Sequence, residues 1–226
     1  MSLHRPHSRA LIAGGTGRVG HAIAERLRAD GWTVIAAGRA DGDLRTRDGA
    51  AGLVQQALDE LGGLELVVHA AGAGFVPKPV EDVTEADWDA ALDVTAKGTF
   101  FLAQAAAAAL RQSHGVLVII EDAASFDPWV SFGPHSAAKA AQAMLTRVFA
   151  RALAPEVRVC GVAPGPVAVD PSQEKRRAAE TLLERVGSPA DIAEAVVYLA
   201  GAEYVTGTTL VVDGGLLLQT RRRSNP

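Results

Sequence analysis

The chain has 226 residues, 48% of them hydrophobic and 21% charged, with a formal net charge of −4. This length suits one α/β domain with a substantial core, and the slight acidity gives no reason to expect a nucleic-acid partner. Cys160 is the single cysteine, so an internal disulfide is excluded, and without a long apolar stretch or a signal-type N-terminus we expect a cytoplasmic protein with no membrane contact.

Short apolar runs alternate with helical hydrophobic spacing along the chain. A strand at residues 10–13 leads into a glycine-rich turn, after which Val19, Ile23 and Leu27 recur at four-residue spacing, as on one face of a helix. Further strands are predicted at residues 32–37, 64–68, 116–120, 157–162 and 209–212. Further helices are predicted around 54–61, after 84, and at 96–112, 136–153 and 190–200.

This alternation predicts the fold class α/β, as one doubly wound parallel sheet of Rossmann type. We expect a single domain over residues 1–226 with a flexible tail at 221–226. Residues 39–47 are too few to hold a further helix and strand, so the crossover after the second strand is shortened. A capping-box signature at Thr84 and Asp87 predicts a helix start.

The glycine-rich turn after the first strand is placed to receive a pyrophosphate on backbone N–H groups and a helix N-terminus. An ordinary tight turn is the alternative, and its position after the first strand of an alternating chain favours cofactor binding. The predicted contacts in this turn are Gly14, Thr16, Gly17, Arg18, Val19 and Gly20.

The end of the second strand indicates which dinucleotide is preferred. A carboxylate there would repel a 2′-phosphate, but this chain has Gly38 followed by Arg39, whose guanidinium can pair with the phosphate. NADP(H) is therefore the predicted cofactor, with Asp43 and Leu44 also bordering it. The alternative for Arg39 is a solvated loop cation. No metal site is predicted.

Five motifs in order, from Arg9 to about Leu218, resemble those of the short-chain dehydrogenases/reductases. They are AGGTGRVG, VVHAAG, HSAAK, VAPGPV and YVTGTTLVVDGG. Beyond the glycine turn, the resemblance implies cofactor contacts at Ala70, Ala71, Gly72, Lys139, Pro164, Gly165 and Val167.

The resemblance places the catalytic Asn, Ser, Tyr and Lys of that family on Thr95, Asp122, His135 and Lys139, so that the lysine alone is retained. Arg18 in the glycine turn, Asp122 in place of the serine, and the stretch FARALAPEVRV resemble pteridine reductases and dihydromonapterin reductases. That similarity implies reduction of a pterin ring with NADPH and a substrate contact for Arg18.

The altered set can still supply a proton beside a nicotinamide. His135 and Lys139 are four residues apart and would share one face of a helix, and imidazole is a competent general acid near neutral pH. Asp122 would orient the imidazole or hold a polar edge of the substrate. The structural alternatives are that His135 is a helix-start residue, that Asp122 caps a turn, and that Thr95 and His69 serve the core.

Three functions follow: an NADPH-dependent reductase of a small cyclic carbonyl or imine such as a pterin, a non-catalytic NADP(H)-binding protein acting as sensor or partner subunit, and non-redox chemistry on the same scaffold. Phe126, Trp129 and Phe132 could line a pocket for a flat ring, and residues 166–189 could form a mobile lid. Small residues along 103–109 and 137–143 favour close helix packing in a homotetramer or homodimer.

Overall fold

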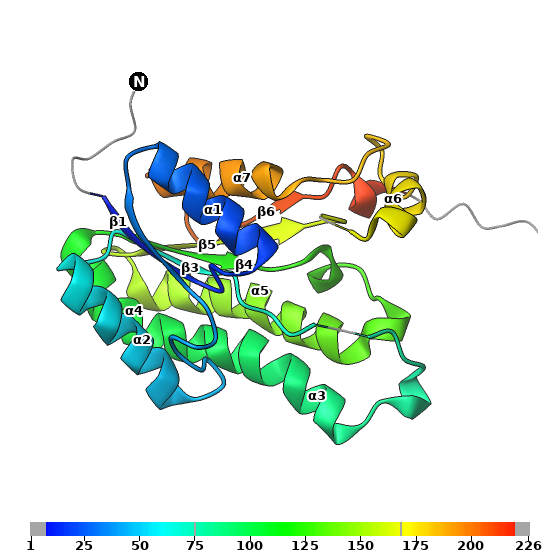
Figure 1. Cartoon of the computed structure of the whole chain (residues 1–226), viewed down its shortest axis with the longest axis horizontal. Helices are drawn as coiled ribbons and strands as arrows, with labels where there is room; N and C mark the ends of the chain where they lie inside the picture. Colours follow the sequence, from blue (N-terminus) through cyan, green and yellow to red (C-terminus); the bar gives the residue numbers. More distant parts are fainter. Residues whose placement is uncertain (1–7, 75, 168, 220–226) are drawn as a thin grey trace, which may run out of the picture.

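The computed structural model describes residues 8–74, 76–167 and 169–219, and these form one sheet of six parallel strands in the order β2-β1-β3-β4-β5-β6 (Figure 1). The strands are β1 Arg9–Ala13, β2 Thr33–Ala37, β3 Leu66–His69, β4 Val116–Ile120, β5 Arg158–Pro164 and β6 Thr209–Val212. The predicted Rossmann-type architecture is confirmed. The predicted tail at 221–226 lies outside the described residues.

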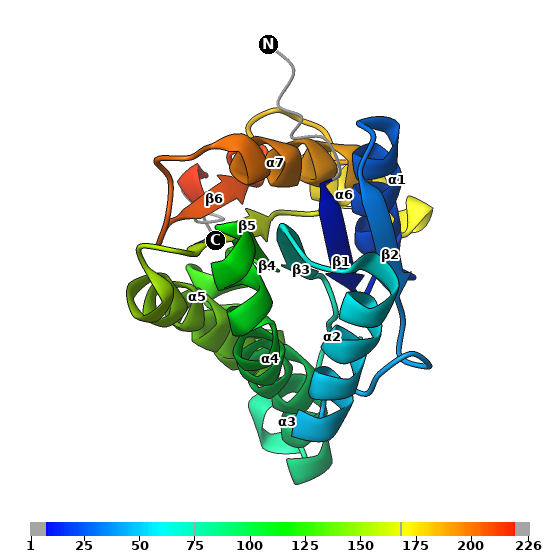
Figure 2. The ribbon, with the colours of Figure 1, turned by 90° about the vertical axis from the view of Figure 1, so that its left-hand side faces the viewer.

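Helices cover both faces of the sheet, as the view in Figure 2 shows, with α1 and α7 on one face and α2, α4 and α5 on the other. Their bounds are α1 Arg18–Ala29, α2 Arg47–Leu61, α3 Glu85–Leu92, α4 Gly98–Ser113, α5 Gly133–Leu153, α6 Pro171–Ala178 and α7 Pro189–Gly201. The continuous apolar strands supply a buried core to each face, one built on Leu11, Val67 and Leu117 and the other on Ile12, Val68 and Val118. No helix of the described residues is long and apolar enough to cross a membrane.

The shortened crossover predicted after the second strand is confirmed. In the described sheet β2 is an edge strand that pairs only with β1, and the chain passes from it to α2 without a further strand. The capping box at α3 is also confirmed, because the Thr84 hydroxyl accepts the Asp87 N–H while the Asp87 carboxylate accepts the Thr84 N–H.

Two helix starts differ from the sequence prediction. A π-helical turn, η2 Asp93–Lys97, precedes α4, which therefore begins at Gly98 instead of 96. The helix predicted from 136 begins at Gly133, because Pro134 is compatible with the first turn of a helix, where its missing N–H costs nothing. Consequently His135 lies inside the first turn of α5.

The segment predicted as a lid, residues 166–189, contains α6, which the sequence analysis did not foresee. The Asp170 carboxylate accepts the Ser172 N–H at 2.8 Å and Pro171 opens the helix. Most residues of α6 are polar or charged, so hydrophobic spacing does not predict this helix.

Candidate active site

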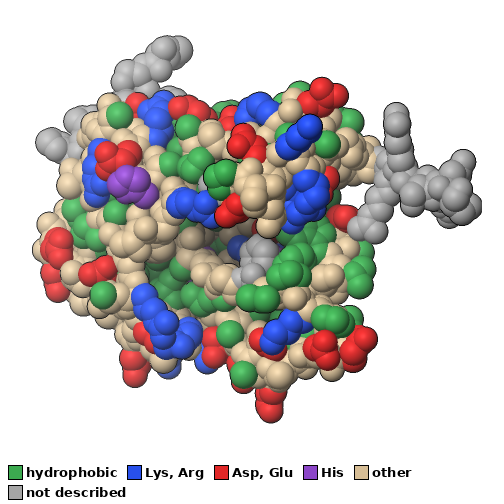
Figure 3. Space-filling view, turned by 45° about the vertical axis from the view of Figure 1, so that its right-hand side comes forward, with side chains coloured by type: hydrophobic (Ala, Val, Ile, Leu, Met, Phe, Trp, Pro, Cys, Tyr) green, Lys and Arg blue, Asp and Glu red, His purple; other side chains and the backbone are tan. Residues whose placement is uncertain are grey.

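The residues predicted to bind a cofactor gather where the parallel strands end. In α/β sheets of this kind ligands bind in the crevice outside the carboxyl ends of the strands. Figure 3 looks toward this end and shows a hollow with hydrophobic side chains beside it.

The glycine turn between β1 and α1 is too tightly packed for larger residues. Gly14 has φ +89°, and a Cβ there would collide with the backbone of Ala71, while a Cβ at Gly20 would collide with the Gly14 carbonyl. No side chain caps the first turn of α1, and no acidic residue lies in that turn. Its N–H groups and the positive end of the helix dipole are therefore suited to an anion.

A cavity of about 540 Å³ lies between this turn, the loop after β2 and the loop after β3. The predicted cofactor residues that border it are Gly14, Thr16, Gly17, Arg39, Asp43, Leu44, Ala70, Ala71 and Gly72. Arg18, Val19 and Gly20 instead form the start of α1, where Arg18 is exposed. Gly38, Gly42, Arg45, Leu53, Ala73, Gly74, Ala90 and Val94 also border it but were not predicted.

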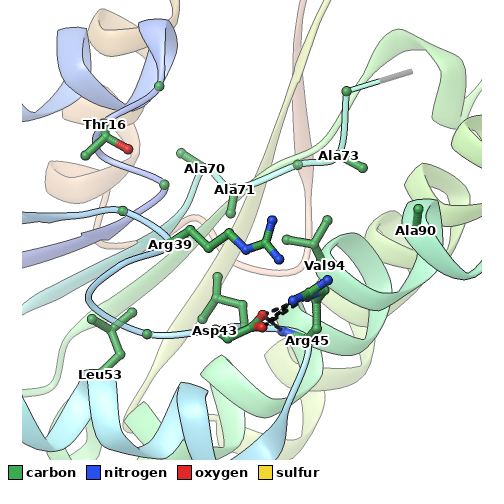
Figure 4. Close-up of a pocket in the computed structure, with 17 residues that line it drawn as sticks. Thr16, Arg39, Asp43, Arg45, Leu53, Ala70, Ala71, Ala73, Ala90 and Val94 are labelled. Atoms are coloured by element: carbon green, nitrogen blue, oxygen red, sulfur yellow. Dashed lines mark hydrogen bonds and ion pairs between the residues drawn. The ribbon is translucent and has the colours of Figure 1, made fainter. Parts of the chain in front are cut away.

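The charged side chains of this cavity differ in the groups that they contact. Figure 4 shows Arg39 extending into the cavity toward Val94, whereas Arg45 is directed at Asp43. Arg45 Nη2 lies 2.6 Å from Asp43 Oδ2, and this pairing lowers the pKa of the Asp43 carboxyl below its usual range. Asp41 folds back so that its Oδ2 accepts the Gly38 N–H at 2.7 Å. Both nearby carboxylates thus have partners within their own loop, and Arg39 reaches the cavity as a cation.

The structure brings together the predicted proton donor and its predicted partner. His135 Nε2 lies 3.4 Å from Asp122 Oδ2, while Asp122 Oδ1 accepts the Ala124 N–H at 2.8 Å. Asp122 therefore both caps the turn after β4 and approaches the imidazole. The Trp129 ring stacks on His135 with centroids 6.3 Å apart and planes at 25°, and the Arg177 guanidinium lies 6.0 Å from the Trp129 centroid.

Lys139 shares the buried face of α5 with His135, as predicted, but its ammonium is directed inward. Nζ donates to the Ile120 carbonyl and to Gln142 Oε1, both at 2.9 Å, and the residue does not border the large cavity. Burial lowers the pKa of Lys139 to about 8, an effect that the carboxylates of Asp122 and Glu121 partly oppose. Thr95 is 2% exposed, and its carbonyl accepts the Thr99 hydroxyl, which agrees with the structural alternative for this position.

Sequence reasoning missed Gln142 and Glu121. Gln142 is fully buried against Lys139. Glu121 accepts from Thr146 at 2.6 Å and from Thr209 at 2.9 Å, and burial raises the pKa of its carboxyl. For Gln142 the sequence did contain a signal: polar residues recur at 135, 139, 142 and 146, which is the spacing of one helix face.

A second cavity, of about 220 Å³, is bordered by His135 and by Phe132, Val76 and Val83. It shares Ala73, Gly74 and Ala90 with the large cavity, so the two adjoin. Of the three predicted aromatic residues only Phe132 borders it, since Trp129 covers His135 and Phe126 is exposed. Gly165 and Val167 border a separate cavity of about 380 Å³, and Pro164 ends β5.

A doubly wound parallel sheet with a tight glycine turn, an adjoining cavity and a titratable side chain at its rim defines the class of dinucleotide-dependent α/β proteins. A family model described as enoyl-(acyl carrier protein) reductase matches residues 37–217. The chain is 31% identical to 3beta-hydroxysteroid dehydrogenase 1 of Eggerthella lenta, over 92% of this chain and 93% of that protein. It is 31% identical to dehydrogenase/reductase SDR family member 4 of Bos taurus, over 92% of this chain and 86% of that one.

Solved structures share the whole fold. A blue fluorescent protein from a metagenomic library, in complex with NADPH, superposes with a TM-score of 0.85 at 26% identity over 96% of this chain and 99% of that one. The 3-ketoacyl-(acyl-carrier-protein) reductase of Brucella melitensis, complexed with NADH, superposes with a TM-score of 0.87 at 22% identity over 92% and 98%. This chain belongs to the short-chain dehydrogenase/reductase family of oxidoreductases.

Proposed function

We propose that the protein is an NADP(H)-dependent reductase of a small cyclic carbonyl or imine. The observation that carries this proposal is the His135 and Asp122 pair, 3.4 Å apart, with His135 at the rim of a cavity that adjoins the dinucleotide-sized one. Hydride transfer needs a proton donor beside the nicotinamide, and His135 is a titratable side chain that borders the small cavity next to the dinucleotide cavity.

The residues of the large cavity fit a dinucleotide. A side chain at Gly14, Gly15 or Gly20 would collide with neighbouring backbone, and the uncapped first turn of α1 suits a pyrophosphate. A reduced nicotinamide bound there would supply a hydride to the carbon of the substrate's C=O or C=N bond. The oxygen or nitrogen then gains the electron pair and needs a proton. We propose that His135 donates it and that Asp122 holds the imidazole.

Preference for NADP(H) is supported by Arg39, whose guanidinium can form two parallel bonds to a 2′-phosphate. Asp41 accepts from the Gly38 N–H and Asp43 pairs with Arg45, so each of these carboxylates already has a partner within its own loop. The NADPH complex of the metagenomic protein, 26% identical, is consistent with this preference.

The small cavity restricts the substrate. A volume of about 220 Å³, with an ion pair between Lys78 and Asp87 at one side and Phe132 at another, suits a small ring with one polar edge. A pterin remains within this class, but neither Arg18 nor Asp122 borders either cavity, and Asp122 reaches the site only by its approach to His135. One relative is named 3beta-hydroxysteroid dehydrogenase 1, and this name extends the substrate panel to cyclic ketones.

A specific observation favours a second candidate, a non-catalytic NADP(H)-binding protein. The retained lysine is directed into the core and does not border the cofactor cavity. The test is a titration with NADPH and NADH, followed by absorbance loss of the reduced nicotinamide against dihydropterins, quinones and cyclic ketones. Turnover supports the reductase, tight NADPH binding without turnover supports the second candidate, and no binding contradicts both.

We also propose that a second copy of this chain covers the outer surface of α4 and α5. Phe100, Met144 and Val148 are 39%, 54% and 46% exposed on these two helices. Light scattering of the purified protein should give a homodimer or homotetramer, and Met144→Glu should shift it toward monomer. A monomeric parent chain would contradict the proposal.

A further inference from the structure

A chain of hydrogen bonds in the core runs from η2 to Lys139. The Thr99 hydroxyl donates to the Thr95 carbonyl at 2.7 Å, so its proton is already used. Thr99 Oγ1 must therefore accept the 2.8 Å bond from Gln142 Nε2. All three residues are nearly or fully buried, so water does not substitute for any of these partners.

This arrangement permits one orientation of the Gln142 amide. With Nε2 facing Thr99, Oε1 faces Lys139 Nζ at 2.9 Å. A flipped amide would place Oε1 against an oxygen that has no proton to give, and would place an N–H₂ group against the ammonium. The second Nε2 proton can go to the Thr95 carbonyl or to His69 Nδ1, each at 3.3 Å.

We propose that Gln142 is the positioning residue of Lys139: its Oε1 accepts one N–H of the ammonium and holds it on the inward side of α5. An ammonium has three donors, and the Ile120 carbonyl accepts a second one from the same side. The inference goes beyond the proposed function and does not require a bound dinucleotide. The hydrogen bonds themselves join only residues of this protein.

The charge on Lys139 should depend on this bond. Four groups face or adjoin the ammonium: the carboxylates of Asp122 and Glu121 after β4, the imidazole of His69 from β3, and His135 one turn earlier on α5. Burial opposes the charge, and the pKa of Lys139 lies at about 8. Removing the Gln142 oxygen should lower this pKa further, whereas a carboxylate in its place should raise it.

The test is a carbon NMR titration of lysine labelled at Cε, in the chain without any dinucleotide. The sequence has four lysines, and the Lys139 resonance is assigned as the one that disappears in Lys139→Met. Gln142→Leu should move the Lys139 midpoint down by about one pH unit and Gln142→Glu should move it up. Gln56→Leu, on the exposed face of α2, is the matched control and should change nothing.

Equal Lys139 midpoints in the parent, Gln142→Leu and Gln142→Glu would overturn the proposal. Should Gln142→Leu not fold, Thr99→Val removes the acceptor that orients the amide and should give a smaller downward shift, and its parental midpoint would count against the proposal. Because no cofactor or substrate takes part, failure here is distinguishable from failure of the reductase function, which appears in NADPH binding and turnover.

Discussion

Arg39 follows the carboxyl end of β2, and we propose that it sets the preference between the two dinucleotides. A Cβ at Gly38 would approach the Thr16 hydroxyl to 2.7 Å, so a larger residue there would require the Thr16 side chain to move. The neighbouring acids are held by backbone and by Arg45. In the proposed NADP(H) complex, Arg39 would therefore supply the positive charge that pairs with the 2′-phosphate.

Arg39→Asp should reverse the cofactor preference. A charge-assisted pair becomes a repulsion, which is worth about 1.5–3 kcal/mol, or about 10- to 100-fold in the dissociation constant of NADPH. Fluorescence titration with NADPH and NADH measures both constants. Arg47→Asp, which makes the same charge change at an exposed position outside the cavity, should leave the order intact. Equal affinities of the parent for the two dinucleotides would refute the assignment.

Individual site residues were predictable where the motif spacing fixes them. The spacing between Asp122 and His135 predicted that the two side chains lie close together, and His135 Nε2 lies 3.4 Å from Asp122 Oδ2. The direction of the Lys139 ammonium was not predictable, because it depends on Gln142, which lies on the same helix but is oriented by Thr99 from α4. A single sequence carries no direct sign of such a contact between helices.

At the scale of elements, α6 is linked to His135, the proposed proton donor, through an aromatic ring. Arg177 of α6 lies over Trp129, and Trp129 stacks on His135. Trp129 is close to η4 Val130–Phe132, so the loop before α5 and the segment after β5 meet above the imidazole. Sequence analysis predicted a lid here but not its helix, because a polar helix fixed by an N-cap has little hydrophobic periodicity.

Trp129→Ala should loosen α6. Loss of a cation–π contact worth about 0.5–1 kcal/mol should raise the rate of trypsin cleavage after Lys175 or Arg176 by about 2- to 5-fold, since both are exposed on α6. Mass spectrometry of the fragments with time gives the rate at each site. Trp88→Ala, at a half-exposed tryptophan on α3, is the control. Identical cleavage of α6 in both variants would contradict the link.

At the scale of the whole molecule, the fold was predictable because its signals are local and repeated. Buried parallel strands appear as apolar runs, and the missing strand after β2 follows from the shortness of residues 38–46. The π-helical turn η2 was not predictable, since it packs against α5, whose position the local sequence does not indicate. That turn places Thr95 in the core, where its carbonyl starts the chain of bonds to Lys139.

His69 should make the whole fold sensitive to acid. It is completely buried, and burial together with the ammonium of Lys139 lowers its pKa to about 3. Below the ordinary histidine pKa of about 6.5, the unfolded chain therefore binds a proton that the folded chain does not, and stability falls as pH falls from about 6.5 toward 3.

This single site should lower the free energy of unfolding by about 2 kcal/mol between pH 6.5 and 5. Urea denaturation at a series of pH values measures it. His69→Asn removes the titration and should flatten the curve, whereas His21→Asn, at an exposed position on α1, should not. A His69→Asn curve that keeps the parental slope would show that another group is responsible.

We propose that His135 donates the proton in an NADPH-dependent reduction. The measurement that tests this is the pH dependence of the initial rate at saturating NADPH. It compares the parent with His135→Ala on a substrate from the panel. If His135 is the donor, the parental rate should fall with rising pH, and His135→Ala should lose this pH dependence together with about 100-fold or more in kcat. A variant that retains the parental rate and pH dependence would contradict the claim and place the proton source elsewhere.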